Sequence, residues 1–210
     1  MSRKLGPPYE WRSQKQKPPQ QGGFLIAKYI YTFYADGGKK YNLEVDEYPD
    51  HIYILKFYVA ANVKHPDRFN MLADIGFLAA RRLLDTCFHV MSDILKRDPL
   101  ASGGFIGAPK ILKAKKQKAF GRKGGVQERK LEKVSETQRY RVYTLLAQNY
   151  FSPKNWDHYD FGEESLYLLV NRSNPQPDIP QVAWDLYNNL KEIPQDERRP
   201  FPIKVTGLRS

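Results

Sequence analysis

The 210-residue chain has a single cysteine, Cys87, and no long apolar run. One cysteine excludes a disulfide within the chain. Its place on the apolar face of a predicted helix indicates a small buried hydrophobe rather than a nucleophile. No stretch of about 18 uncharged apolar residues occurs, and residues 1–17 lack the apolar centre of a signal peptide. We therefore expect a soluble, cytoplasmic protein that does not enter a membrane.

The motifs of several catalytic and binding sites are also missing. No cysteines and histidines occur at zinc-ligand spacing, and neither an RNP-type aromatic signature nor a helix-turn-helix is recognisable. The glycines at 121–125 lack the first glycine and the Ser/Thr of a Walker loop. Acidic residues gather beside a histidine at 44–51 and at 157–160. Alternation places Glu44 and Asp46 on the solvent face of a strand, and the second group falls in a predicted loop, so we expect no metal at either.

Positive charge, in contrast, is abundant. The chain has 34 Lys+Arg against 23 Asp+Glu, a formal net charge of +11 and a mean hydropathy of -0.65. A hydrophobic fraction of 41% and an aromatic fraction of 13% are too high for a disordered chain. This combination predicts one folded domain with charged extensions, and a partner that is acidic: nucleic acid, an anionic surface or a phosphorylated ligand.

Both ends of the chain are rich in proline and in charge. Residues 1–23 are predicted to be a basic disordered arm, and residues 194–210 an extended tail. The arm is either a passive solubilising segment or a contact, because Tyr9 and Trp11 could stack on bases or dock on a protein surface. Its candidate polyanion-binding residues are Arg3, Lys4, Arg12, Lys15 and Lys17.

Residues 24–193 have the pattern of a single α+β domain. A β-branched and aromatic run, the turn Asp36-Gly37-Gly38 and an alternating strand predict a hairpin, and Ile52–Ala60 adds a third strand to an antiparallel meander. Apolar residues at spacings of three and four over 70–97 predict a long helix packed on the sheet. A turn at 102–104 should follow. The remaining predicted elements are a strand at 105–108, a helix from 135 to 151, a strand at 164–171 and a helix ending near 190.

The densest positive segment is a predicted loop at 110–133, which holds ten Lys/Arg against two Glu. Closely spaced cations neutralise phosphates, and the glycines within the loop allow it to follow a backbone of any sequence. The alternative is a solvated loop with no specific role. The candidate polyanion-binding residues here are Lys110, Lys113, Lys115, Lys116, Lys118, Arg122, Lys123, Arg129 and Lys130.

The order of elements, a meander followed by helix, strand, helix and strand, resembles the central part of the GNAT superfamily of N-acetyltransferases over residues 24–171. Arg139–Phe151 is similar to the family's helix that carries a tyrosine near the thiol of acetyl-CoA. The resemblance implies acetyl-CoA as cofactor and Tyr143 as general acid; it extends to small GNAT-like proteins of phages and mobile elements. From its helical spacing alone, Tyr143 is a core residue.

The chain departs from the family where the pyrophosphate should bind. GNAT enzymes use a glycine-containing turn between the central strand and the long helix, because backbone amides must approach the phosphates closely. Residues 60–71 contain no glycine, so only side chains such as Lys64, His65 and Arg68 could supply charge; Lys64 and Arg68 are the candidate cofactor-binding residues. The sequence therefore favours a non-enzymatic protein that binds an acidic partner, foremost nucleic acid, without a cofactor. The alternatives are an N-acetyltransferase and an assembly subunit whose tails wrap neighbouring proteins.

Overall fold

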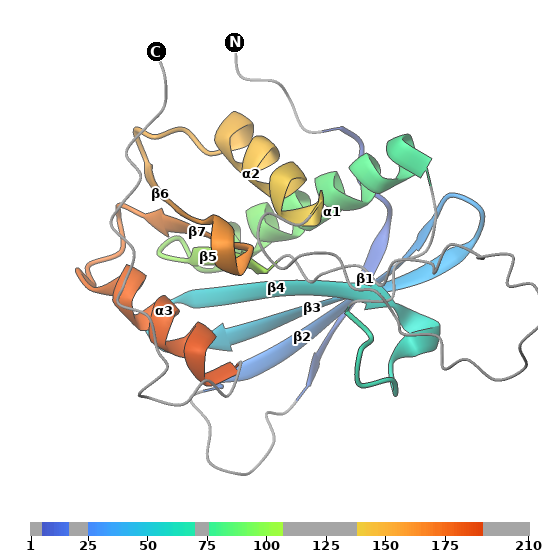
Figure 1. The fold of residues 1–210 in the computed structure, drawn as a ribbon, viewed down its shortest axis with the longest axis horizontal. Coiled ribbons are helices and arrows are strands. Elements are labelled where there is room, and N and C mark those ends of the chain that lie inside the picture. The colour runs from blue at the N-terminus through green and yellow to red at the C-terminus, as the bar shows by residue number, and fades with distance from the viewer. Residues whose placement is uncertain (1–5, 17–24, 70–75, 107–137, 191–210) are drawn as a thin grey trace, which may run out of the picture.

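The computed structural model describes residues 6–16, 25–69, 76–106 and 138–190. Within them the chain forms a seven-stranded mixed sheet with helices on both faces (Figure 1). The strands are β1 (Trp11–Gln16), β2 (Ala27–Ala35), β3 (Lys39–Tyr48), β4 (Ile52–Val59), β5 (Ser102–Ile106), β6 (Trp156–Phe161) and β7 (Leu166–Asn171). The helices are α1 (Gly76–Arg97), α2 (Gln138–Tyr150) and α3 (Ile179–Leu190), with short 3-10 turns η1 (Ala60–Asn62) and η2 (Gly162–Glu164).

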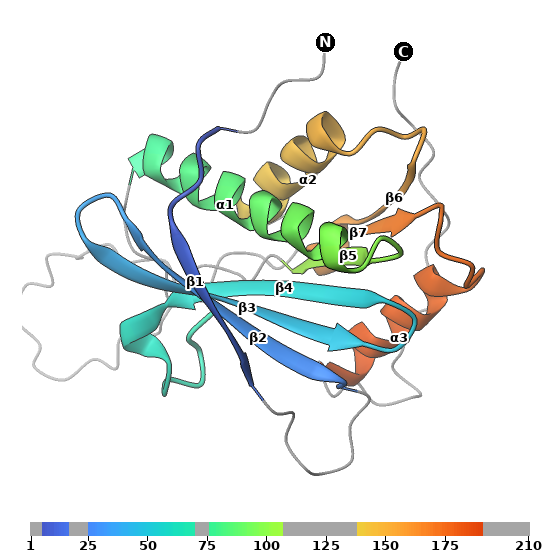
Figure 2. The same cartoon turned by 180° about the vertical axis from the view of Figure 1, so that it is seen from behind.

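The strands lie in the order β1-β2-β3-β4-β5-β7-β6. β1 to β4 form an antiparallel meander, whereas β4 and β5 are parallel. A parallel pair needs a crossover connection, and α1 provides it. Seen from either side, α1 and α2 cover one face and α3 covers part of the other (Figures 1 and 2). The predicted α+β class with helices packed on a mixed sheet is confirmed.

Two tight turns fix the register of the meander. Gly37 and Gly38 have φ of +80° and +74°, and the Gly38 amide donates to the Ala35 carbonyl at 3.0 Å. This confirms the predicted hairpin, because only glycine adopts such angles without a steric cost. The second turn places Asp50 and His51 at φ of 62° and 60°, so that β4 returns directly beside β3.

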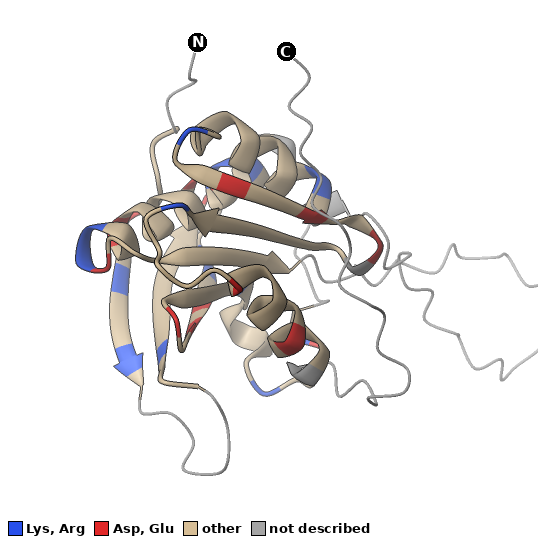
Figure 3. Ribbon diagram, turned by 90° about the vertical axis from the view of Figure 1, so that its left-hand side faces the viewer, with Lys and Arg blue, Asp and Glu red and all other residues tan. Residues whose placement is uncertain are grey.

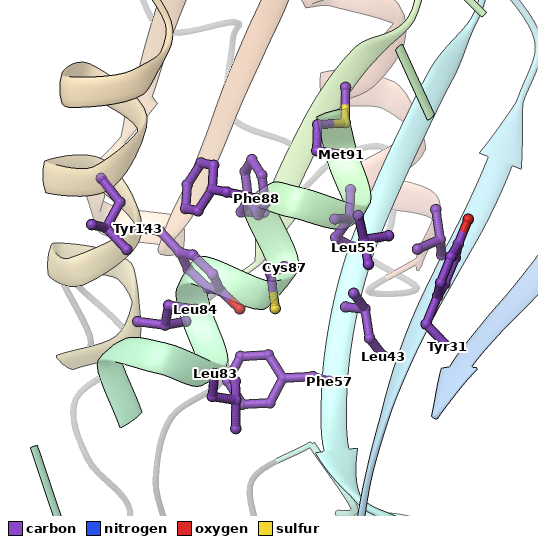
Figure 4. Close-up of a cluster of buried hydrophobic side chains, with 14 of the residues drawn as sticks. Tyr31, Leu43, Leu55, Phe57, Leu83, Leu84, Cys87, Phe88, Met91 and Tyr143 are labelled. Atoms are coloured by element: carbon purple, nitrogen blue, oxygen red, sulfur yellow. The ribbon is translucent and has the colours of Figure 1, made fainter. Parts of the chain in front are cut away.

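The face under α1 and α2 holds the larger core. The predicted apolar stripe of α1 is confirmed from Gly76 onward, since Leu83, Cys87, Val90 and Ile94 are all buried. The predicted helix start, at 70–75, lies outside the described residues. Figure 4 shows Leu83 and Cys87 of α1 facing residues of the sheet: Tyr31, Leu43, Leu55 and Phe57. A second core forms where α3 packs its Trp184 and Tyr187 against the opposite face.

The predicted turn at 102–104 is wrong, because these residues begin β5. Gly103 and Gly104 do not form a turn; they allow neighbouring side chains to approach the backbone of β5 closely. A Cβ on Gly104 would lie 2.5 Å from Ile54 Cδ1, and one on Gly103 would lie 3.0 Å from Met91 Sδ. Lacking side chains, the two residues let β5 sit against β4 and beneath α1.

The predicted loop at 157–160 is also wrong. Trp156–Phe161 is strand β6, paired antiparallel with β7. Its polar residues alternate poorly, and it lies at the end of the strand order, where polar strands are common. Among the described residues, no helix is both long enough and apolar enough to cross a membrane.

The disordered arm predicted at 1–23 is wrong for residues 6–16, because Trp11–Gln16 forms β1 beside β2. Tyr9 anchors the segment. Its side chain is buried, its amide donates to Thr86 Oγ1 at 2.9 Å, and its hydroxyl donates to Asp36 at the same distance. The Arg82 guanidinium lies 4.2 Å from the centre of the Tyr9 ring. One buried aromatic therefore holds a stretch whose average composition is that of a disordered chain.

Candidate functional site

Two of the predicted polyanion-binding residues, Arg12 and Lys15, lie on β1 with exposed side chains. They face opposite sides of the sheet, since Arg12 pairs with Thr32 and Lys15 with Tyr29. Lys15 Nζ lies 5.3 Å from the centre of the Tyr29 ring. The structure therefore does not join these two cations into one patch. Arg3, Lys4, Lys17 and every candidate of the 110–133 loop lie outside the described residues, as does the predicted tail at 194–210.

The described residues as a group carry no excess charge. Their Lys and Arg equal their Asp and Glu in number, so the +11 of the whole sequence belongs to the segments outside them. Figure 3 shows both signs scattered over the helices and strands. The described strands and helices are therefore electrically balanced, and the excess of Lys and Arg belongs to residues outside the described ranges.

Tyr143, the candidate general acid, points from α2 into the core (Figure 4). It is only 1% exposed, and its ring centre lies 5.1 Å from that of Phe105 and 6.3 Å from that of Phe57. The position matches the core residue that helical spacing indicates.

In the junction after β4, the candidate cofactor site, part of the backbone is already hydrogen-bonded within the segment. Lys64 is exposed, as a binding residue should be. Four amides of residues 60–69, however, already donate within the segment, from Val63 to Ala60 O, His65 to Asn62 O, Arg68 to His65 O and Asp67 to His65 Nδ1. A pyrophosphate is held by amides that point outward together, and these four are engaged elsewhere.

Arg68 turns back from this junction onto the face of the sheet opposite α1. Its guanidinium lies 4.5 Å from the Phe69 ring centre and 5.3 Å from that of Tyr58. The two rings meet edge to face at 5.3 Å. One guanidinium nitrogen, Nη2, is 3.7 Å from a Glu44 oxygen. Stacking on aromatic faces fixes the plane of an arginine side chain, so Arg68 is oriented toward Glu44.

Glu44 is part of a buried group of charges that we call the charged cluster: Lys28, Glu44, Asp46, Lys56 and Arg68. Lys28 Nζ lies 2.6 Å from Glu44 Oε1 and 3.4 Å from Asp46 Oδ1. Lys56 Nζ lies 2.6 Å from Asp46 Oδ2 and 3.3 Å from Glu44 Oε1. Each lysine therefore bridges both carboxylates, and three cations surround two anions.

The expectation that Glu44 and Asp46 face solvent is wrong, because both residues are only 3% exposed. Alternation did place them correctly on the face away from Leu43 and Val45. Burial follows from the register, which sets Lys28 opposite Asp46 and Lys56 opposite Glu44. Carboxylates are tolerated in a buried position when cations reach them from the neighbouring strands.

The pKa values follow from this arrangement. Burial alone would raise the pKa of Glu44, but Lys56, Lys28 and Arg68 together hold it below its ordinary value. Burial alone would lower the pKa of Lys28, and Glu44 and Asp46 outweigh that effect and raise it. Both groups are therefore charged at neutral pH.

His158 and His51, the histidines beside the two acidic groups of the sequence, contact residues of the fold itself. His158 uses both ring nitrogens, contacting the Tyr167 hydroxyl at 2.8 Å and the Phe151 carbonyl at 2.9 Å. His51 Nδ1 lies 2.8 Å from Asp98, which also accepts from Tyr53 at 2.9 Å. Over the described residues, no group of three or more His, Cys, Asp or Glu is placed to hold a metal ion.

Comparisons with family models, with curated proteins and with solved structures found no match to this chain.

Proposed function

We propose that this chain is a non-enzymatic binding protein whose acidic partner is nucleic acid, contacted through the basic segments around a neutral folded body. The supporting observation is the separation of charge: the described body is balanced, and the +11 lies in the segments outside it. More than half of the cations outside the body belong to the 110–133 loop. Phosphate contacts depend on such locally dense cations, whereas a balanced surface gives little attraction.

Edge strand β1 extends the proposed interface into the body. Arg12 and Lys15 are exposed on it, and the adjoining residues 6–10 are fixed to α1 through Tyr9 and Thr86. Their opposite orientations suit contacts with different parts of a flexible strand better than with one rigid groove. We therefore expect single-stranded nucleic acid to bind at least as well as duplex.

The test is fluorescence anisotropy with a labelled oligonucleotide over a range of salt concentrations. The slope of log affinity against log salt reports the number of phosphates neutralised, about 0.7 per contact for single strands. Replacing Lys113, Lys115, Lys116 and Lys118 with Gln should reduce this slope by about 2 to 3. Insensitivity of the wild type to salt, or the absence of binding, would contradict the proposal.

A matched control removes the same charge from the body. Lys39, Lys40, Lys64 and Lys96 are exposed, and replacing all four with Gln lowers the net charge equally. The salt slope of this variant should differ from that of the wild type by no more than about 0.7, the value of one phosphate contact. The reason is that these four lysines are not concentrated in one segment. Equal losses in both variants would show that total charge, and not the loop, determines binding.

Acetyl transfer is the second candidate, supported by the parallel β4–β5 pair that α1 connects. Against it stand the engaged amides of residues 60–69 and the burial of Tyr143. We expect acetyl-CoA to leave the melting temperature of the protein unchanged. A concentration-dependent rise would favour the enzyme, because a ligand that binds only the folded state must stabilise it.

A further inference from the structure

We propose that Lys28, Lys56 and Arg68 form a binding site for a phosphate group on the face of the sheet opposite α1. All three cations gather around the same carboxylate, Glu44. The ligand would be inorganic phosphate or a small phosphate monoester. None of these three residues belongs to the basic segments of the proposed function, and the proposal does not depend on those segments.

Exposure is arranged in two layers within the charged cluster. The side chains of Lys28, Lys56 and Arg68 are 23%, 17% and 28% exposed, whereas those of Glu44 and Asp46 are 3% and 4% exposed. Solvent therefore meets the cations first. The carboxylates lie beneath and hold the two ammonium groups in fixed positions, so a ligand does not have to order flexible lysines on binding.

The charge of the cluster is incomplete. Among the described residues, three cations and two carboxylates leave one positive charge over. The cations are only partly hydrated, so a counter-charge such as an oxyanion would stabilise the excess positive charge. Because the pKa of Glu44 is lowered and that of Lys28 is raised, this imbalance persists at neutral pH.

Hydrogen-bond donors are also left over. The Nε of Arg68 is buried without a hydrogen-bond partner, and its Nη2 lies 3.7 Å from Glu44, beyond hydrogen-bonding distance. One acceptor of the cluster, Asp46 Oδ1, is likewise buried without a hydrogen bond and lies 3.4 Å from Lys28 Nζ. Within the described part of the chain no residue accepts a hydrogen bond from the Arg68 side chain. Each ammonium has three donors and meets two carboxylates, so a third donor remains on Lys28 and on Lys56.

The geometry favours phosphate over a carboxylate ligand. Arg68 presents a planar fork, held by stacking on Phe69 and Tyr58, that matches two oxygens of one anion. The ammonium donors of Lys28 and Lys56 are separate points of contact. A tetrahedral phosphate has enough oxygens for the fork and the lysines, whereas a carboxylate has two.

The site is tested by thermal shift and calorimetry with inorganic phosphate, against sodium chloride of equal ionic strength. Phosphate should raise the melting temperature of the wild type. Arg68→Gln should weaken phosphate affinity by about tenfold or more, the usual size of a charged hydrogen-bonded contact. Lys40→Gln is the matched control, because Lys40 is exposed on the same face of β3, outside the charged cluster, and its loss removes one positive charge too. Its affinity should stay within about twofold.

A second measurement serves if Arg68→Gln fails to fold. Phosphate titrated into the wild type should shift NMR amide signals of β2, β3 and β4 around Lys28, Glu44 and Lys56. The absence of a phosphate-specific rise in melting temperature overturns the proposal, as does an equal loss of affinity in Lys40→Gln or a set of NMR shifts elsewhere.

A variant of the 110–133 loop distinguishes phosphate binding at the sheet face from phosphate binding in the loop. Replacing Lys113, Lys115, Lys116 and Lys118 with Gln should weaken oligonucleotide binding and leave inorganic phosphate affinity unchanged. If inorganic phosphate affinity falls with it, phosphate binds in the loop and the sheet-face site is refuted. If only the oligonucleotide result fails, the proposed function is wrong and the phosphate site stands.

Discussion

On one face of strands β2 to β4 the sheet meets α1 and α2 through aromatic and aliphatic side chains, while on the other face the same strands present lysines and carboxylates. The contrast occurs between adjacent residues: Leu43 and Val45 are fully buried in the core, and Glu44 between them is 3% exposed on the opposite side. One face is thus closed to water by packing, whereas on the other the carboxylates are covered by partly exposed cations that pair with them.

The comparison shows that alternation decides the side of a residue and its neighbours decide its burial. An apolar residue on this sheet is stabilised by removal from water, at about 25 cal/mol per Å². A carboxylate gains nothing from burial itself and depends on cations that offset its desolvation. The packed face should therefore tolerate losses of shape poorly, and the charged face losses of charge.

The largest effect is expected on the packed face. Phe88→Ala should lower the free energy of unfolding by about 4 kcal/mol, through lost burial and the cavity left behind. The ring of Phe88 is fully buried and stacks on Phe105 at 5.0 Å. Urea unfolding measures the change. Leu78→Ala is the control on the same helix, because Leu78 is 80% exposed and should change little. Similar losses in both variants would show that the core is misplaced.

On the charged face, Glu44→Gln should cost about 3 kcal/mol, the lower end of the range for breaking a buried ion pair, because the partner lysines partly reach water. The substitution keeps the shape and removes the charge that three cations share. Its control, Asp93→Asn, breaks an exposed pair with Arg97 at 3.5 Å and should cost less than about 1 kcal/mol. If the two variants were equally stable, the charged cluster would be a surface feature and the contrast between the faces would fail.

The sequence predicted the structure correctly where apolar residues recurred at regular spacing or where a turn had a clear glycine signal. The Asp36-Gly37-Gly38 hairpin, the buried stripe of α1 and the α+β class are confirmed. Strands β1 and β6 were missed because they are short, polar and at the ends of the strand order, where apolar alternation is not required. The glycines of β5 were misassigned because close approach and turns favour the same residue.

The charged cluster was missed although a signal for it existed. The predicted Asp36-Gly37-Gly38 turn and the turn at Asp50 and His51 fix the register of the meander, and that register sets Lys28 opposite Asp46 and Lys56 opposite Glu44. Opposite charges at paired positions on adjacent strands would have indicated mutual neutralisation. The contribution of Arg68 could not be foreseen, because it reaches the cluster from an irregular segment. The loop at 110–133 stays a prediction, since it lies outside the described residues.

The smallest expected effect is on the pH dependence of stability, which differs between the two faces of the sheet. On the helix side, burial lowers the pKa of His158 from its ordinary 6.5, despite opposing contributions from the Phe151 carbonyl and Asp157. On the charged face the pKa of Glu44 is held below its ordinary 4.5. In each case the unfolded chain takes up the proton at a higher pH than the folded protein does. Stability is therefore full above the ordinary value and falls as the pH drops through the folded value.

Two windows of acid destabilisation should follow, one beginning below about pH 6.5 for His158 and one below about pH 4.5 for Glu44. Urea unfolding at intervals from pH 8 to pH 3.5 would resolve them, as differences between each variant and the wild type. His158→Gln should flatten only the upper window and Glu44→Gln only the lower one, because each removes a single titrating group. An upper window that survives His158→Gln would mean that its pKa is not lowered by folding. A lower window that survives Glu44→Gln would mean that the lysines do not hold the carboxylate in its charged form.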